Sequence, residues 1–170
     1  EKYENMPKDI QWHMIGHVQR NKVKYMAEFV NLIHGVDSLK LLKEINKQAK
    51  KYNRIIECLL QIKIAEEDSK FGMSANDASA LLQSEELSTL QNIKITGLMG
   101  MATFTDDEDQ LKNEFNFLKS TFNQLKDSQS ANCELETLSM GMSGDYEIAI
   151  KCGSNMIRVG SSIFGARNYN

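Results

Sequence analysis

Short apolar stretches recur along the chain at spacings that leave room for a helix between most neighbouring pairs. Polar residues or glycine bound most of them, which is typical of buried strands in a layered fold. The pattern predicts strands at residues 10–15, 32–36, 55–64, 93–99, 136–140 and 156–159. The run at 55–64 is nearly continuous in apolar residues, which favours a parallel sheet covered by helices.

The segments between these strands show helical periodicity. In residues 39–49 apolar side chains recur three or four positions apart, and Asp37 or Ser38 can cap this helix. Residues 23–30 place four apolar side chains on one face of a short helix, and residues 108–125 predict the longest helix. Strands that alternate with helices in this way indicate a parallel α/β architecture.

Two consecutive predicted strands each end in a loop of glycine and serine. These loops are residues 141–144 and 160–162, and Ile163 and Phe164 can start a short helix after the second. Such loops let backbone N–H groups approach a phosphate, and in a (β/α)8 barrel a phosphate site often forms at the loops after the last two strands. Ordinary turn chemistry is the alternative, since glycine and serine end many strands.

Three sequence blocks carry a resemblance to a known family. They are WHMIGHVQRNK at 12–22, SMGMS at 139–143 followed by Asp145, and RVGS at 158–161 with IFGAR at 163–167. In this order they resemble the motifs of the YggS/PROSC family of pyridoxal phosphate homeostasis proteins. The resemblance implies a TIM-type barrel like the N-terminal domain of alanine racemase, with pyridoxal 5′-phosphate as its cofactor.

The resemblance also implies a cofactor site at the two glycine–serine loops. The residues expected to contact the phosphate or border the cofactor are Ser143, Gly160, Ser161, Ser162 and Met140. We expect no metal ligands, because the sequence shows no converging histidine, cysteine or carboxylate groups at useful spacing.

Arg158 and His13 complete the expected cofactor site. Arg158 ends a strand whose outer face helices would cover, so its side chain should point into the barrel mouth. There it would face the pyridine nitrogen, as an arginine does in alanine racemase, and would leave that nitrogen unprotonated because arginine keeps its proton. His13 either lines the mouth or is a structural, hydrogen-bonded residue. His34, alone inside a strand, is expected in the core.

A closed barrel would need more strands than this sequence supplies. Eight units and about 250 residues are typical, whereas this sequence has 170 residues and six predicted strands. The resemblance places two further units before residue 12, including the lysine that forms a Schiff base with the cofactor, so that lysine is expected upstream of Glu1. We therefore predict one domain over residues 1–170, an incomplete barrel of about six strand–helix units with an exposed edge that invites dimerisation.

Composition and charge narrow the function classes. The hydrophobic fraction of 41% and the charged fraction of 25% are those of an ordinary globular protein. The net charge of −3 does not favour binding to nucleic acid or to an anionic membrane, which are both negatively charged. No apolar run approaches the length of about 20 residues that a membrane helix needs. Three scattered cysteines predict reduced thiols and a cytoplasmic protein.

These observations predict a pyridoxal-phosphate-binding protein of vitamin B6 homeostasis, and we expect it to have no catalytic turnover. The family barrel lacks the second domain that completes the alanine racemase site, so it can hold the cofactor but is poorly equipped for racemisation. Two alternatives remain: an amino-acid racemase-like enzyme, and a barrel for another phosphorylated metabolite. Without the upstream lysine, binding should be weak and non-covalent, and sulfate or phosphate could occupy the loops.

Overall fold

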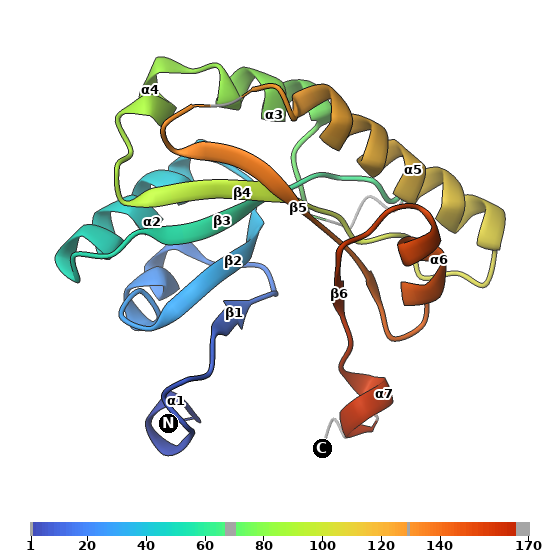
Figure 1. Cartoon of the computed structure of the whole chain (residues 1–170), viewed down its shortest axis with the longest axis horizontal. Helices are drawn as coiled ribbons and strands as arrows, with labels where there is room; N and C mark the ends of the chain where they lie inside the picture. The colour runs from blue at the N-terminus through green and yellow to red at the C-terminus, as the bar shows by residue number, and fades with distance from the viewer. Residues whose placement is uncertain (1, 67–70, 129, 166–170) are drawn as a thin grey trace.

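The computed structural model describes residues 2–66, 71–128 and 130–165 and contains one six-stranded sheet (Figure 1). Neighbouring strands are all parallel, and their order in the sheet follows their order in the chain. The strands are β1 (Trp12–Met14), β2 (Val30–Val36), β3 (Ile56–Gln61), β4 (Ile93–Met99), β5 (Cys133–Met142) and β6 (Met156–Arg158). This arrangement is a half-barrel and confirms the predicted incomplete TIM-type barrel.

A helix follows each strand. The helices are α1 (Lys2–Asn5), the 3₁₀ helix η1 (Arg20–Tyr25), α2 (Leu39–Lys51), α3 (Ala75–Leu82), α4 (Glu85–Ser88), α5 (Glu108–Leu125), α6 (Tyr146–Lys151) and α7 (Ser161–Phe164). The larger helices α2, α3 and α5 cover the convex side of the sheet (Figure 1). Within the described residues, no helix is both long and apolar enough to cross a membrane.

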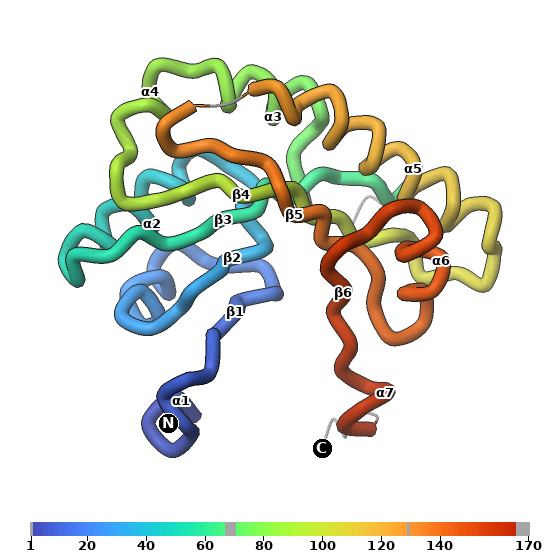
Figure 2. Tube along the Cα trace, in the orientation of Figure 1, coloured from blue at the N-terminus to red at the C-terminus, as the bar shows by residue number. Residues whose placement is uncertain are grey.

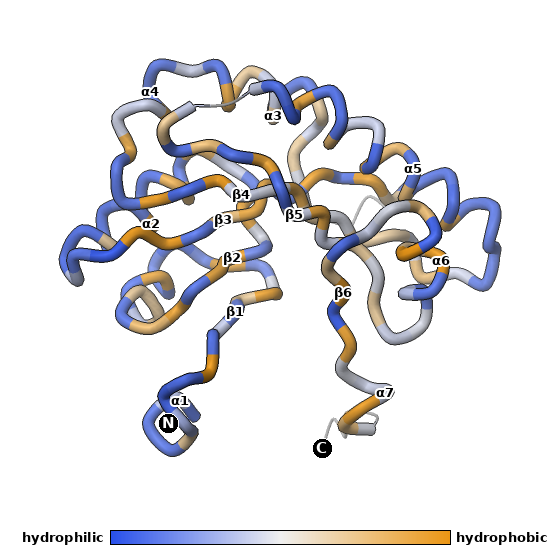
Figure 3. Tube along the Cα trace, in the orientation of Figure 1, coloured by the Kyte–Doolittle hydropathy of each residue, from blue (hydrophilic) through white to orange (hydrophobic). Residues whose placement is uncertain are grey.

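The sheet has two different faces. The helix side carries the main core, in which Ile33, Ile45 and Phe115 are completely buried. The concave side carries a smaller cluster of Leu32, Leu59 and Met99, against which Met101 and Met156 pack. Figure 3 shows apolar segments recurring along the strands, in line with this two-sided burial.

Some predicted boundaries agree with the structure, whereas the bounds of five of the six strands differ at one or both ends. The fourth strand and the longest helix have the predicted bounds, and the Ser38 hydroxyl caps α2 by accepting from the Leu41 N–H. The helix predicted at 23–30 is instead the 3₁₀ helix η1, and Val30 starts β2. The fifth strand starts three residues earlier than predicted, because Cys133 pairs with Ile95 of β4. The quoted residues 166–167 lie outside the described part of the chain.

The strands β1 and β6 form the two edges of the sheet. The short helices α1 and α7 lie beyond these edges, on the same side of the sheet (Figure 2). Each edge strand is three residues long and pairs on one side only.

Gly97 allows the close approach of β4 and β5. A Cβ atom at this position would overlap the backbone carbonyl of Thr137, which is its partner in the register of the two strands. A side chain here would therefore force two central strands apart, since paired strands lie about 4.8 Å from each other.

Candidate functional site

The loops after β5 and β6 meet at the carboxyl edge of the sheet. The register pairs Met142 with Arg158, so the residues that follow each strand end are neighbours. The Ser143 hydroxyl oxygen accepts hydrogen bonds from the Gly160 N–H (3.2 Å) and the Ser162 N–H (3.4 Å). A Cβ atom on Gly160 would meet nothing within 4 Å, so the loop backbone faces open space. Two amide donors and one hydroxyl thus converge at an accessible point.

The turn into the first of these loops is held by local geometry. Gly141 has φ of +96°, and a side chain there would collide with Ala149 of α6. The Asp145 carboxylate accepts a hydrogen bond from the Met142 N–H (2.5 Å), which fixes the loop just before α6 begins. Glycine is needed because other residues rarely adopt this backbone conformation.

Arg158 is the buried cation of the site. Its side chain is 8% exposed, its Nη1 donates to the Ser139 hydroxyl (2.8 Å) and its Nη2 donates to the Gly100 carbonyl (2.9 Å). Its Nε is buried and has no hydrogen-bond partner among the described residues. Burial lowers the pKa of Arg158 to about 10, partly offset by the Asp145 charge, so the guanidinium stays protonated at neutral pH.

Two histidines extend the contacts of Arg158 across the concave face. The His34 Nδ1 lies 3.0 Å from the Ser139 Oγ, and the His34 Nε2 lies 3.3 Å from the His13 Nδ1. Burial, followed by the charge of Arg158 and then by His13, lowers the pKa of His34 to about 3. Burial also lowers the pKa of His13, and Glu57 opposes that shift. At neutral pH His34 is therefore uncharged beside the Arg158 cation.

The low pKa of His34 predicts a loss of stability in acid. The pKa is about 3 in the folded chain against the ordinary 6.5, so between these values only the unfolded chain takes up the proton. The contribution of neutral His34 to the free energy of unfolding should be complete above pH 6.5. As the pH drops below 6.5, the free energy of unfolding should decrease by up to about 1.4 kcal/mol per pH unit. Urea titrations from pH 7 to 4.5 measure this slope. If the free energy of unfolding of His34→Asn decreased equally steeply with falling pH, groups other than His34 would be responsible for the loss.

Glu114 holds the neighbouring loops at the same edge. This buried residue of α5 accepts from the Thr103 N–H and the Thr103 hydroxyl, each at 2.7 Å, and from the Glu66 N–H at 3.4 Å. One carboxylate thus ties together the loops that follow β3 and β4. Since Gly100 begins the second of these loops, Glu114 supports the segment that receives Arg158.

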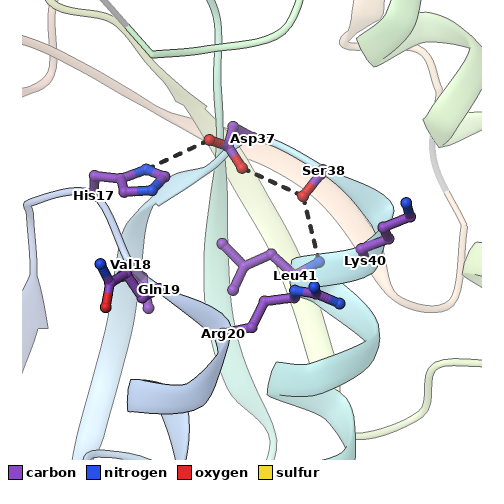
Figure 4. A pocket seen from close by; sticks show the side chains of 8 residues that line it. All are labelled: His17, Val18, Gln19, Arg20, Asp37, Ser38, Lys40 and Leu41. Atoms are coloured by element: carbon purple, nitrogen blue, oxygen red, sulfur yellow. Dashed lines mark hydrogen bonds and ion pairs between the residues drawn. The ribbon is translucent and has the colours of Figure 1, made fainter.

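A separate pocket of about 290 Å³ lies between η1 and the start of α2 (Figure 4). In it His17 Nδ1 lies 3.5 Å from an Asp37 carboxylate oxygen, and the Ser38 hydroxyl bonds to the same carboxylate. His17 also stacks on Phe71. None of the residues that line this pocket belongs to the loops after β5 and β6. Within the described residues no three histidine, cysteine or carboxylate groups gather as metal ligands.

Comparison with known proteins gives a consistent result. The profile of the alanine racemase N-terminal domain matches residues 5–168. The pyridoxal phosphate homeostasis protein of Pasteurella multocida is 37% identical over 166 residues, which cover 98% of this chain and 69% of the relative. The one from Aquifex aeolicus is 35% identical, over 99% of this chain and 73% of the relative.

Solved structures agree with the sequence comparison. PipY of Synechococcus elongatus, solved with pyridoxal phosphate bound, is 31% identical with a TM-score of 0.83, over 96% of this chain and 74% of PipY. The chain belongs to the pyridoxal phosphate homeostasis protein family. An alanine racemase of Clostridium difficile shares the fold, with a TM-score of 0.69 at 17% identity, over 91% of this chain and 41% of the racemase. The chain spans about 70% of the length of its homeostasis relatives.

The structure brings together most of the residues that the sequence singled out in this family member. Ser143, Gly160 and Ser162 share hydrogen bonds, Ser161 lies between the last two and is exposed, and Arg158 precedes them in β6. His13 joins the group through His34. These placements are geometric, and a role in cofactor binding stays a prediction.

Met140 is the exception. Its side chain is completely buried in the main core on the helix side, so the expectation that it borders the cofactor is wrong. Side chains alternate along a strand, and Ser139 takes the concave position next to Arg158. Met140 therefore points away from the site.

Sequence reasoning missed two polar residues of the concave face. The sequence places His34 in the core and gives Ser139 no role beyond its motif, yet both contact the Arg158 network. The available signal was a polar side chain inside an apolar strand, because buried polar groups need hydrogen-bond partners. The partner itself lies 105 residues away in sequence and could not be read from the chain.

Proposed function

We propose that this chain binds pyridoxal 5′-phosphate and serves its intracellular homeostasis, with residues 1–170 acting as one binding unit. The observation that carries the proposal is the unpartnered, buried Nε of Arg158 next to the converging amides of Gly160 and Ser162. A cationic donor and a set of amide donors on neighbouring strands suit a ring acceptor and a phosphate. The pyridoxal phosphate bound in PipY supports the choice of ligand.

The loops after β5 and β6 would hold the phosphate. The N–H groups of Gly160 and Ser162 now donate to the Ser143 hydroxyl, and a phosphate oxygen is a stronger, charged acceptor for the same donors. The Ser143 hydroxyl would then turn and donate to the phosphate as well. The exposed Ser161 stands at the same loop.

Arg158 would orient the pyridine ring. Its Nε–H has no hydrogen-bond partner in the described part of the chain, and the ring nitrogen is an acceptor when unprotonated. The pKa of about 10 keeps the guanidinium charged, so this nitrogen stays without a proton. Pyridoxal phosphate acts as an electron sink when bound to an enzyme, and an unprotonated ring is a weaker sink. Arg158 therefore favours holding the cofactor over turnover.

A ligand titration tests the proposal directly. The fluorescence of the single tryptophan, Trp12, should be quenched by pyridoxal phosphate, inorganic phosphate should compete, and pyridoxal without phosphate should bind more weakly. Phosphate binding without pyridoxal phosphate binding would favour a barrel for another metabolite. A chiral assay with L-alanine should show no sustained inversion, and enzyme-like racemisation would contradict the carrier function.

Placing a negative charge in the phosphate loop should weaken binding. Ser161→Asp brings a carboxylate beside the two amides, and its repulsion of the phosphate should lower the affinity for pyridoxal phosphate about tenfold. Isothermal titration measures the change. Ser88→Asp on the exposed side of α4 adds the same charge elsewhere and should leave affinity unchanged. Equal affinities of both variants would move the phosphate site away from this loop.

We further propose that the protein acts in the cytoplasm and that a second copy pairs with an open sheet edge. Its three free cysteines support a reducing compartment, and the unpaired edges of β1 and β6 support strand association. Light scattering over a range of concentrations measures the mass, and a monomer at all concentrations would contradict the dimer.

A further inference from the structure

We infer that His34 is a positioning residue: as a neutral ring protonated on Nε2, it orients the Ser139 hydroxyl and through it the Arg158 guanidinium. The inference deepens the proposed function and rests on it for the ligand. It comes from the hydrogen-bond inventory of the four side chains on the concave face. His34 reaches the ligand only through other residues, so it is not a catalytic group.

The Ser139 hydroxyl decides the direction of the hydrogen bonds. Arginine can only donate, so the Arg158 Nη1–H occupies a lone pair of the Ser139 Oγ. The hydroxyl has one hydrogen of its own, and Ser139 is fully buried. Among the described residues, its other hydrogen-bond contact is the His34 Nδ1 at 3.0 Å. The His34 Nδ1 must therefore accept, because otherwise the buried hydroxyl hydrogen would have no partner.

This choice fixes the tautomer of His34 and its link to His13. With Nδ1 as acceptor, the ring proton lies on Nε2, which is 3.3 Å from the His13 Nδ1. His13 then accepts at Nδ1 and, when neutral, carries its own proton on Nε2. The hydrogen bonds run in one direction, from Arg158 through Ser139 and His34 to His13.

The directed chain sets the orientation of Arg158. A guanidinium is planar, so fixing Nη1 on Ser139 of β5 and Nη2 on the Gly100 carbonyl also fixes where its Nε–H points. His34, from β2, reaches across the sheet to hold the first of these two acceptors. Without His34, the Ser139 hydroxyl is free to rotate. The Arg158 Nη1 then donates to an acceptor whose orientation is no longer fixed.

Two substitutions of His34 separate positioning from packing. Asparagine places a side-chain oxygen near the Nδ1 position and can still accept from Ser139, whereas leucine fills similar volume without an acceptor. We expect His34→Leu to weaken pyridoxal phosphate binding about tenfold, and His34→Asn by less than about threefold. A packing role would instead make leucine equal to or better than asparagine, and that result would overturn the inference. If His34→Leu does not fold, Ser139→Ala should show the same tenfold loss.

Nuclear magnetic resonance of the unliganded chain with ¹⁵N-labelled histidine and arginine gives a readout that needs no ligand. We expect the His34 proton on Nε2, and faster solvent exchange of the Arg158 Nε–H in His34→Leu than in His34→Asn. A proton on Nδ1, or equal exchange rates in both variants, would overturn the inference. If the unsubstituted chain fails to bind pyridoxal phosphate, the proposed function falls, while these signals still decide the role of His34.

Discussion

Arg158→Leu should weaken the binding of pyridoxal phosphate about a hundredfold. Among the residues that the structure describes, the substitution removes the buried cation of the site together with its unpartnered Nε–H donor. A hydrogen bond from a charged donor contributes up to about 3 kcal/mol. The substitution also leaves the Gly100 carbonyl and the Ser139 hydroxyl without their donor. Tryptophan quenching and isothermal titration both report the affinity.

Two control variants define what this result means. Arg158→Lys keeps the charge but loses the planar guanidinium group. Its affinity for pyridoxal phosphate should therefore lie between the affinities of the wild type and of Arg158→Leu. Arg20→Leu removes an exposed arginine in η1 and should leave the affinity unchanged. If Arg158→Leu bound as tightly as the wild type, the ring could not lie against the Arg158 Nε.

Gly97→Ala should have the largest effect on stability. The added methyl group would overlap the Thr137 carbonyl, which is backbone and cannot move without separating β4 from β5. We expect the free energy of unfolding to fall by at least about 4 kcal/mol, which is enough to unfold a marginally stable domain. Circular dichroism with urea titration measures the loss.

Gly144→Ala is the matched control for stability. A Cβ atom at Gly144 would meet no atom within 4 Å, and its backbone φ is not in the left-handed region, so its unfolding free energy should change by less than about 0.5 kcal/mol. Similar stability of the two alanine variants would contradict the close strand contact at Gly97.

The fold was predictable where one pattern dominated. β4 is a short apolar run, and α5 combines long periodicity with Asp107 as its cap, so both had clear bounds in the sequence. The sequence also carries a signal for the start of β5, since buried Cys133 and Leu135 alternate with exposed glutamates as in a strand with one solvated face. The prediction missed this start because it relied on continuous apolar runs. The apolar spacing around η1 predicts an α-helix, because spacing alone does not distinguish a short 3₁₀ helix from an α-helix.

The site was predictable only in its local part. The two glycine–serine loops and Arg158 stand out because each lies at the end of a predicted strand, and Arg158 directly precedes the second loop. The sequence could not predict toward which face of the sheet the Met140 side chain points. The second half of β5 is buried on both faces, so its hydrophobic pattern does not distinguish the helix side from the concave side. The contacts of His34 join β2 to β5 and exist only in the folded chain.

The position of β6 at the margin of the sheet has a consequence for dynamics. This three-residue strand carries Arg158, and within the described sheet it pairs with β5 alone. Segments held in this way open at lower free energy than the interior of a domain. The amides of β6 should thus exchange with deuterium sooner than those of β3 or β4, and saturating ligand should slow them selectively. Loss of the cofactor would then begin with fraying of this margin, well before the rest of the chain unfolds.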